Sequence, residues 1–143
     1  MPYDPADLDE MMEIENLSFT APWSRNSYEE LSPLDTIHIW IAKLKKRVVG
    51  YMLFQNLGED IELHTLAVAP ALRRKGIARK LMDHMIAEGR RFGIKRIFLQ
   101  VRPSNASARP FYEDLGFKPI GLRRAYYRDD GEDAMVMKLE LKG

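Results

Sequence analysis

The stretch PALRRKGIARKLMDHM, residues 70–85, follows an apolar run and opens a segment with helical periodicity. Apolar side chains recur along it three and four residues apart, which predicts an amphipathic helix; they are Ile77, Leu81, Met82, Met85 and Ile86. Residues 59–68 before it, EDIELHTLAV, and residues 96–102 after it, RIFLQVR, have the composition of strands. The three segments form a strand–helix–strand unit, which predicts one parallel pair of strands.

The rest of the chain surrounds this unit with further helices and strands. We expect helices within residues 6–19, 22–32 and 105–117, and strands within residues 38–44, 48–57, 120–127 and 133–141. The first two of these strands are separated by a short polar turn, which indicates a hairpin. The predicted order is ααβββαβαββ, a mixed α/β fold with helices packed on a mostly antiparallel sheet. No repeat or long linker interrupts it, so we expect a single domain over residues 1–143.

Composition excludes several kinds of site. The 143 residues contain no cysteine, which removes disulfides, thiolate metal sites and a cysteine nucleophile. The chain begins without the basic and apolar regions of a signal peptide and has no run of eighteen apolar residues. We therefore expect a soluble cytoplasmic protein with no membrane partner. The net charge of +1 argues against direct nucleic-acid binding.

Charge is unevenly distributed along the chain. Residues 1–35 hold nine acidic side chains and one basic one, whereas residues 73–96 hold nine basic and two acidic ones. The basic segment indicates an anionic ligand, and the acidic end would favour a cationic acceptor. Solvated charged faces are the alternative explanation for both runs.

The basic segment coincides with the start of the predicted helix. Backbone N–H groups in a first helical turn lack intrahelical partners and carry partial positive charge. Gly76 would let an anion approach this backbone, and Arg73, Arg74 and Lys75 would surround it, which predicts a phosphate site. A solvated basic loop is the alternative. The spacing fits neither G-x-x-x-x-G-K-[ST] nor G-x-G-x-x-G, so nucleotide hydrolysis and hydride transfer lose support.

Two motifs resemble those of one superfamily. Arg73-x-x-Gly76-x-Ala78 resembles the acetyl-CoA signature of the GNAT N-acetyltransferases. A second motif resembles the later helix of that superfamily; it is Asn105-x-x-Ala108-x-x-x-Tyr112-x-x-x-Gly116-Phe117. The resemblance implies a GNAT-like fold, in which a twisted, mostly antiparallel sheet is flanked by helices on both faces. It also implies acetyl-CoA as the acetyl donor and no metal.

Further segments narrow the resemblance. APWSRNSYEEL near the N-terminus, LQVRPSN in the middle and RRAYYRDDGEDAMVMKLEL at the C-terminus are similar to the ribosomal-protein-alanine N-acetyltransferases, which acetylate protein N-termini. This similarity implies that the acceptor is a protein or peptide N-terminus, with a ribosomal protein as one candidate. Trp23, Tyr126 and Tyr127 match aromatic positions that border the acceptor groove in that family, although such residues are more often packing residues.

The resemblance also assigns residues to the donor. It places the pyrophosphate on the loop from Arg74 to Arg79 and the pantetheine arm beside the strand end at Leu66–Val68. Asn105 would contact the cofactor, and an ordinary helix cap is its alternative role. Tyr112, two helical turns further on, would protonate the departing thiolate, and a core tyrosine is the alternative. The full predicted cofactor set is Leu66, Ala67, Val68, Arg73, Arg74, Lys75, Gly76, Ile77, Ala78, Arg79, Asn105 and Tyr112.

The general base is where the sequence departs from the family. Gln100 stands at the position of a family glutamate, and a neutral amide is a poor proton acceptor. Glu62 is the first candidate to replace it, because it matches the catalytic glutamate of the histone-acetylating branch. His64 is the second. Strict strand alternation predicts that Glu62, His64, Leu66 and Val68 share one face of the sheet. For both candidates, an ordinary strand residue is the alternative.

Several functions stay open on the sequence alone. Deprotonating an α-amine of pKa about 8 at pH 7 costs about 1.4 kcal/mol, whereas a lysine amine of pKa about 10.4 costs about 4.6 kcal/mol. A site without a strong base therefore favours an N-terminal acceptor. The alternatives are acetylation of a small amine or a lysine side chain, a CoA-binding module without catalysis, and an RNA-binding domain. The sequence does not determine the oligomeric state.

Overall fold

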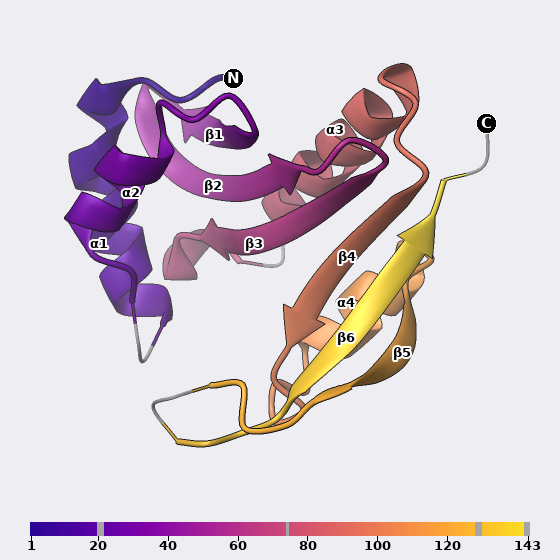
Figure 1. The fold of residues 1–143 in the computed structure, drawn as a ribbon. Helices are drawn as coiled ribbons and strands as arrows, with labels where there is room; N and C mark the ends of the chain where they lie inside the picture. Colours follow the sequence, from indigo (N-terminus) through magenta and orange to yellow (C-terminus); the bar gives the residue numbers. More distant parts are fainter. Residues whose placement is uncertain (20–21, 74, 128–129, 142–143) are drawn as a thin grey trace.

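The computed structural model describes residues 1–19, 22–73, 75–127 and 130–141, in which the elements follow the predicted order ααβββαβαββ (Figure 1). The helices are α1 (Leu8–Ser18), α2 (Arg25–Leu31), α3 (Ile77–Arg91) and α4 (Ala108–Asp114). The strands are β1 (Ile37–Leu44), β2 (Arg47–Asn56), β3 (Asp60–Val68), β4 (Arg96–Val101), β5 (Lys118–Arg123) and β6 (Ala134–Glu140). Two short 3₁₀ helices, η1 (Pro5–Asp7) and η2 (Pro70–Leu72), precede α1 and follow β3. Within the described residues, no helix has the length and hydropathy of a membrane span.

The six strands of the described chain form one sheet in the order β1-β2-β3-β4-β6-β5. Neighbouring strands are antiparallel except for β3 and β4, which are parallel. This pair flanks α3 in the chain, so the predicted strand–helix–strand unit is confirmed. The predicted hairpin of β1 and β2 is also present, and its turn places Lys45 and Lys46 at φ values of 51° and 70°.

Helices cover both faces of the sheet, as predicted. On β2, Tyr51 and Leu53 belong to the core under α1 and α2, whereas Met52 and Phe54 belong to the core under α3 and α4. We call these the α1/α2 face and the α3/α4 face; Figure 1 shows α1 and α2 on one side of the sheet and α3 on the other. Most of the helical stripe predicted for α3 is buried on its face, namely Leu81, Met82, Met85 and Ile86.

The parallel pair of strands is short. β3 and β4 pair only at Asp60–Arg96, Ile61–Ile97 and Glu62–Phe98. Beyond these residues β3 and β4 no longer pair with each other in the described chain, and they diverge (Figure 1). We call the space between residues 63–68 of β3 and residues 99–101 of β4 the strand opening.

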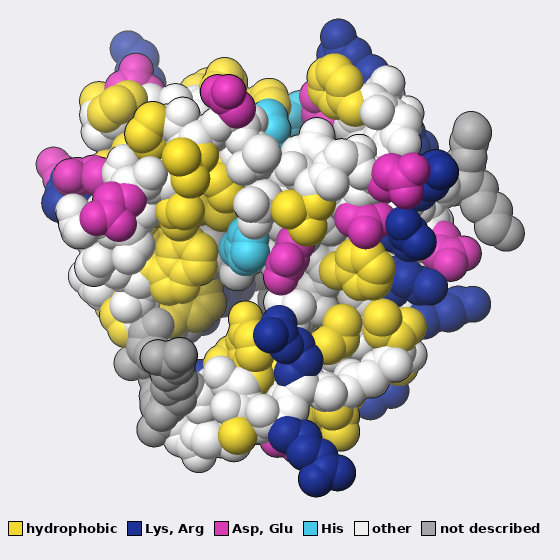
Figure 2. All heavy atoms as spheres, in the orientation of Figure 1, with side chains coloured by type: hydrophobic (Ala, Val, Ile, Leu, Met, Phe, Trp, Pro, Cys, Tyr) yellow, Lys and Arg dark blue, Asp and Glu magenta, His cyan; other side chains and the backbone are white. Residues whose placement is uncertain are grey.

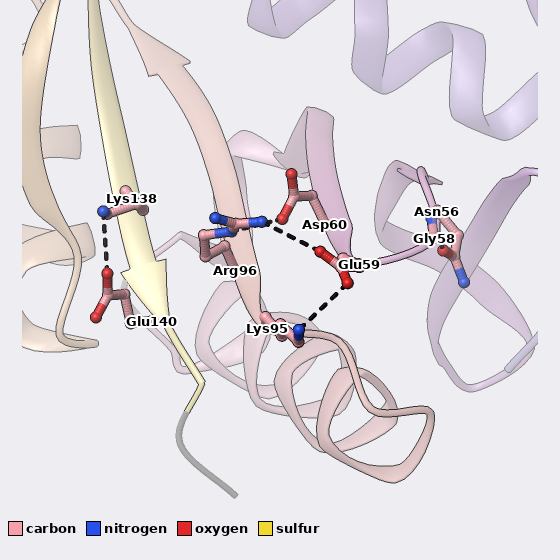
Figure 3. A network of polar contacts seen from close by, with 8 residues as sticks. All are labelled: Asn56, Gly58, Glu59, Asp60, Lys95, Arg96, Lys138 and Glu140. Carbon is pink, nitrogen blue, oxygen red and sulfur yellow. Dashed lines mark hydrogen bonds and ion pairs between the residues drawn. The ribbon is translucent and has the colours of Figure 1, made fainter.

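Ion pairs hold the closed end of the strand opening. Arg96 Nε on β4 donates a hydrogen bond of 2.8 Å to Asp60 Oδ1 on β3, and a second nitrogen of Arg96 lies 3.6 Å from Glu59 Oε2. Lys95 Nζ lies 3.2 Å from Glu59 Oε1, and Figure 3 shows both basic side chains turned toward the same acidic turn. The hydrogen bond to Asp60 raises the pKa of Arg96, which keeps it charged. These contacts fix the place from which β3 and β4 separate.

A β-bulge in β3 changes which side chains face each core. β2 pairs with the residues on either side of His64 and leaves His64 as the extra residue. Leu63 and Leu66, three residues apart, consequently both pack on the α3/α4 face, and Val68 lies beside Ile77 of α3. The prediction of one shared face is therefore wrong: Leu66 and Val68 lie on the α3/α4 face, and Glu62 and His64 on the α1/α2 face.

Candidate active site

The strand opening is a hollow in the molecular surface. Figure 2 shows this hollow in the orientation of Figure 1, bordered on both sides by hydrophobic side chains. The edge of β3 at Leu66–Val68 pairs with β2 on one side, and on the side of β4 it has no strand partner among the described residues. An unpaired edge of this kind can bind an extended chain through its backbone groups. The predicted contact of Leu66, Ala67 and Val68 with the pantetheine arm is compatible with this geometry and stays a prediction.

The start of α3 has the open backbone expected of an anion site. Gly76 is the N-cap of the helix, with a φ of 83°, and no side chain caps the first turn. A Cβ at Gly76 would meet no atom of the described residues within 4 Å. The N–H groups that follow belong to Ile77, Ala78 and Arg79, and Lys75 is exposed next to them. These residues can hold a pyrophosphate without rearranging the backbone.

Arg73 of the predicted set is bound to two other parts of the fold. Arg73 Nε donates to the Val68 carbonyl at 3.3 Å, and its terminal nitrogen donates to Ser18 Oγ at 3.1 Å. Arg73 therefore joins the end of β3 to the end of α1, and this position favours a structural role over contact with the anion. Arg74 lies outside the described residues.

Tyr112 lies on α4 and faces the core on the α3/α4 face. It is 9 % exposed, and its ring meets Phe111 and Phe117 edge-on at centroid distances of 5.1 and 5.8 Å. Burial raises the pKa of Tyr112 well above its ordinary value, and the nearby Tyr127 shifts it in the same direction. Within the described residues, no hydrogen bond engages its hydroxyl. A neutral phenol of this kind can donate to a developing thiolate.

The start of α4 differs from the prediction. The helix begins at Ala108, so Asn105 lies in the turn before it and the argument from two helical turns fails. Asn105 Oδ1 accepts from Ala108 N–H at 3.2 Å and from Ser107 Oγ at 3.1 Å, but the N-cap residue of α4 is Ser107, so Asn105 is not the ordinary helix cap given as its alternative. Pro110 falls in the first turn of α4, where its missing N–H costs no helical hydrogen bond.

The candidate bases gather on the opposite face from Tyr112. Glu62 pairs with Phe98 at the closed end of the strand opening, two residues before Gln100 on β4. Ile61 and Leu63 flank Glu62 and belong to the α3/α4 core, so Glu62 faces the other way, and Gln100 does so by the same alternation. His64 Nε2 lies 3.1 Å from Gln55 Oε1. Glu62, His64 and Gln100 therefore share the α1/α2 face.

The predicted acceptor aromatics lie in different segments of the chain. The ring of Trp23 lies 6.4 Å from that of His64 beside the bulge. Tyr126 and Tyr127 follow β5 and meet edge-on at 5.0 Å. Arg102, after β4, lies over the Tyr127 ring at 3.9 Å.

Sequence reasoning missed Arg102 and Glu132 as supports of this aromatic pair. Glu132 accepts from the N–H and the hydroxyl of Ser104, both at 2.8 Å, and from Arg102 at 3.3 Å. The Ser104 backbone and side-chain hydrogen bonds lower the pKa of Glu132. The segment after β4 is thereby tied to the segment before β6. The sequence signal was available, because both residues lie in the segments LQVRPSN and RRAYYRDDGEDAMVMKLEL.

A second missed group lies under α1. Glu15 is 1 % exposed and accepts hydrogen bonds from the hydroxyls of Tyr28 and Tyr51, at 2.6 and 2.5 Å, and from the backbone N–H of Trp23 at 2.9 Å. The available signal was an acid on the apolar stripe of α1. Two other acids of the N-terminal segment are also engaged, since the buried Asp7 pairs with Lys43 at 2.8 Å and the partly exposed Glu10 with Arg47 at 3.5 Å.

With this geometry in place, the comparisons with known proteins decide the family. The sequence matches the model of the acetyltransferase (GNAT) family over residues 8–117. The chain belongs to this family. As a GNAT acetyltransferase, it is an N-acetyltransferase that uses acetyl-CoA as its acetyl donor.

Relatives of known assignment cover nearly the whole chain. The [ribosomal protein bS18]-alanine N-acetyltransferase of Escherichia coli is 31 % identical over 140 residues, which span 96 % of this chain and 94 % of that protein. The enzyme of the same description from Haemophilus ducreyi is 30 % identical over 138 residues, 94 % of each chain. The crystal structure of the ribosomal-protein-S18-alanine N-acetyltransferase from Escherichia coli superposes with a TM-score of 0.91 at 29 % identity, covering 100 % of this chain and 94 % of that one. The GNAT fold expected from the sequence is confirmed.

Proposed function

We propose that this GNAT acetyltransferase acetylates the α-amine of a protein N-terminus, with the N-terminal alanine of ribosomal protein bS18 as its first candidate acceptor. The similarity to two bS18-alanine N-acetyltransferases over 94 % or more of the chain carries the proposal. The whole domain that the sequence predicts, residues 1–143, would form the enzyme. An acceptor on the ribosome would place it in the cytoplasm.

The strand opening gives the two substrates separate approaches. The Leu66–Val68 edge and the open start of α3 lie where acetyl-CoA would bind, and Tyr112 closes the α3/α4 face. The acceptor would then reach the thioester from the α1/α2 face, past Trp23 and His64. Held in this way, the amine and the thioester meet in a ternary complex without an acyl-enzyme step, since the chain has no cysteine.

The transfer needs two proton movements. The amine nitrogen forms a bond to the carbonyl carbon, the carbon–sulfur bond breaks, the nitrogen loses one proton and the departing sulfur gains one. Tyr112 would donate to the sulfur, because its raised pKa keeps the phenol protonated at neutral pH. Glu62 would accept the amine proton, directly or through water, with His64 as the second candidate.

The replacement of the family glutamate by Gln100 supports an α-amine acceptor. Without a strong base beside the amine, the enzyme depends on the fraction of acceptor that is already neutral. That fraction is larger for an α-amine than for a lysine, because deprotonating the α-amine at pH 7 costs roughly 3 kcal/mol less free energy. The replacement of the glutamate therefore favours an α-amine acceptor over a lysine acceptor.

A panel of acceptors tests the proposal. Thiol release from acetyl-CoA is measured with peptides beginning with alanine, with N-terminally blocked peptides that contain lysine, and with polyamines. We expect the alanine peptides to support turnover at least tenfold faster than either other class. Preferential turnover of blocked lysine peptides or polyamines would contradict it, and acetyl-CoA binding without turnover of any acceptor would support a non-catalytic module.

A further inference from the structure

Glu15 is a buried carboxylate to which the acyl-transfer chemistry gives no role. It is 1 % exposed, and within the described residues no lysine or arginine forms an ion pair with it. Its partners are three hydrogen-bond donors from three places in the fold: Tyr51 on β2, Tyr28 on α2 and the Trp23 backbone in the loop before α2. Burying a carboxylate without a cation is costly unless its oxygens are well bonded, as they are here.

The donors show what Glu15 holds in place. Of the seven residues of α2, Tyr28 alone is buried, so the side chain of Tyr28 fixes this helix to the rest of the fold. The Tyr28 ring lies 5.5 Å from the Trp23 ring and meets the Tyr51 ring edge-on at 6.2 Å. Glu15 thus joins α1, α2 and the sheet at one point.

Glu15 and its hydrogen-bond donors also contact residues of the strand opening, on the α1/α2 face. Thr65, which directly follows the extra residue of the β3 bulge, is buried and pairs with Leu53, a residue of the core that also holds Tyr28 and Tyr51. Trp23, held by its backbone N–H, places its ring 6.4 Å from the ring of His64. The wall of the opening on the α1/α2 face, formed by Trp23 and His64, therefore depends on the carboxylate at Glu15.

We propose that Glu15 is a positioning residue for the acceptor: by fixing Trp23 and α2 against the β3 bulge, it sets the affinity for the incoming amine substrate without touching it. This inference rests on the proposed entry of the acceptor from the α1/α2 face. The donor elements, α3 with Gly76 and α4 with Tyr112, lie on the other face, and their buried side chains belong to a different core from that of Tyr28 and Tyr51. Loss of Glu15 should consequently affect the acceptor and spare acetyl-CoA.

Replacing Glu15 by glutamine tests the hydrogen bonds and preserves the shape of the side chain. One Glu15 oxygen accepts from both tyrosines and the other from Trp23 N–H. An amide has one oxygen, so its NH₂ group must face either the Trp23 donor or the two hydroxyls. Asp7→Asn is the matched control. Asp7 is also a buried carboxylate, 5 % exposed, and it directly precedes α1, but it forms an ion pair with Lys43.

The experiment compares Michaelis constants for the acceptor peptide and for acetyl-CoA in the parent, Glu15→Gln and Asp7→Asn proteins. We expect Glu15→Gln to raise KM for the acceptor about tenfold and KM for acetyl-CoA less than twofold, whereas Asp7→Asn changes neither beyond twofold. Equal increases in both constants, or an acceptor KM no higher than that of Asp7→Asn, would overturn the proposal. If Glu15→Gln does not fold, Tyr28→Phe, which removes one donor and keeps the aromatic packing, carries the same expectation.

A readout independent of turnover separates this inference from the proposed function. In a Trp40→Phe background, Trp23 is the single tryptophan of the chain. We expect Glu15→Gln to increase acrylamide quenching of Trp23 fluorescence at least twofold, with Asp7→Asn unchanged. If no peptide is acetylated by the parent, the proposed function fails, and quenching still decides whether Glu15 positions Trp23; unaltered quenching in Glu15→Gln would refute that role.

Discussion

Glu62 lies where β3 and β4 separate, and it faces the side of the sheet opposite to Tyr112. Tyr112 packs in the α3/α4 core with the two neighbours of Glu62, namely Ile61 and Leu63, while Glu62 itself turns to the α1/α2 face. The proposed proton donor and the proposed proton acceptor therefore lie on opposite faces of the sheet. An acyl transfer that releases a proton from the amine and gives one to the sulfur needs this separation of roles.

The Tyr112 hydroxyl is expected to act on turnover more than on binding. Tyr112→Phe keeps the ring between Phe111 and Phe117 and removes only the hydroxyl, which lacks a hydrogen-bond partner among the described residues. Loss of a general acid typically costs about 100-fold or more in rate. We expect kcat to fall by about that factor and the Kd for acetyl-CoA to change less than twofold, as measured by steady-state kinetics and calorimetry. Unchanged kcat would remove Tyr112 from the mechanism.

The pH profile follows from the raised pKa of Tyr112. Burial shifts that pKa upward, so the phenol stays protonated through neutral and mildly alkaline pH. The rate should then rise with pH up to about 9, as the α-amine loses its proton, with no decline from loss of the acid. Initial rates from pH 6 to 9.5 check this expectation. A rate that falls above pH 8 in a protein that remains folded would show that a different group supplies the proton.

Substitutions at Glu62 and Gln100 test which position can supply the general base. Glu62→Gln is expected to slow the reaction about tenfold at pH 6.5 and less at pH 8.5, because more of the acceptor is already neutral there. Gln100→Glu adds a carboxylate on the same face and should raise kcat/KM at pH 6.5, even in the Glu62→Gln background. Gln100→Ala, which removes the amide without adding a base, is the control. A pH profile of Glu62→Gln identical in shape to that of the parent would exclude Glu62 as the base.

Gly76 and Gly93 form a matched pair for testing the anion site. Both have positive φ, 83° and 74°, and neither has an atom within 4 Å of the position of a Cβ, so alanine strains the backbone similarly in both. Each substitution should cost about 1 kcal/mol in the free energy of unfolding. Only Gly76→Ala should weaken acetyl-CoA binding, about fivefold or more, because Gly93 lies beyond the other end of α3. Equal affinities in the two variants would argue against the start of α3 as the pyrophosphate site.

Glu132 should support the aromatic pair in a pH-dependent way. Its pKa is lowered in the folded protein from an ordinary value of 4.5, mainly by the Ser104 hydrogen bonds. The stabilisation is therefore complete above that ordinary value and is lost as the pH falls through the lower folded value. The Tm difference between the parent and Glu132→Gln should be constant from pH 6 to 8 and vanish in acid. Glu113→Gln, which loses only an exposed pair with Arg109, serves as control. A Tm difference that grows in acid would contradict this reading.

The fold could be predicted where local pattern decides it. The apolar stripe from Leu81 to Ile86 predicted the helix α3. Because this helix lies between two apolar runs in the sequence, it also predicted the parallel pair of β3 and β4. The start of α2 is also decided locally, since the side chain of its N-cap residue Ser24 accepts from Ser27 N–H at 3.1 Å.

The missed features depend on partners distant in sequence. The bulge at His64 arises from the register between β3 and β2, which no single strand pattern reveals. Arg73 carries charge in the sequence exactly as Lys75 does, yet contacts with Val68 and Ser18 turn it away from the start of α3. Glu15 is likewise explained only by donors from α2 and β2.

The acceptor amine is the central claim, and one peptide can test it directly. A peptide that begins with a free alanine and carries an internal lysine offers both amines at equal concentration, and tandem mass spectrometry locates the acetyl group after partial turnover. We predict acetylation on the alanine nitrogen in more than nine products out of ten at pH 7. Acetylation mainly on the lysine side chain would contradict the account.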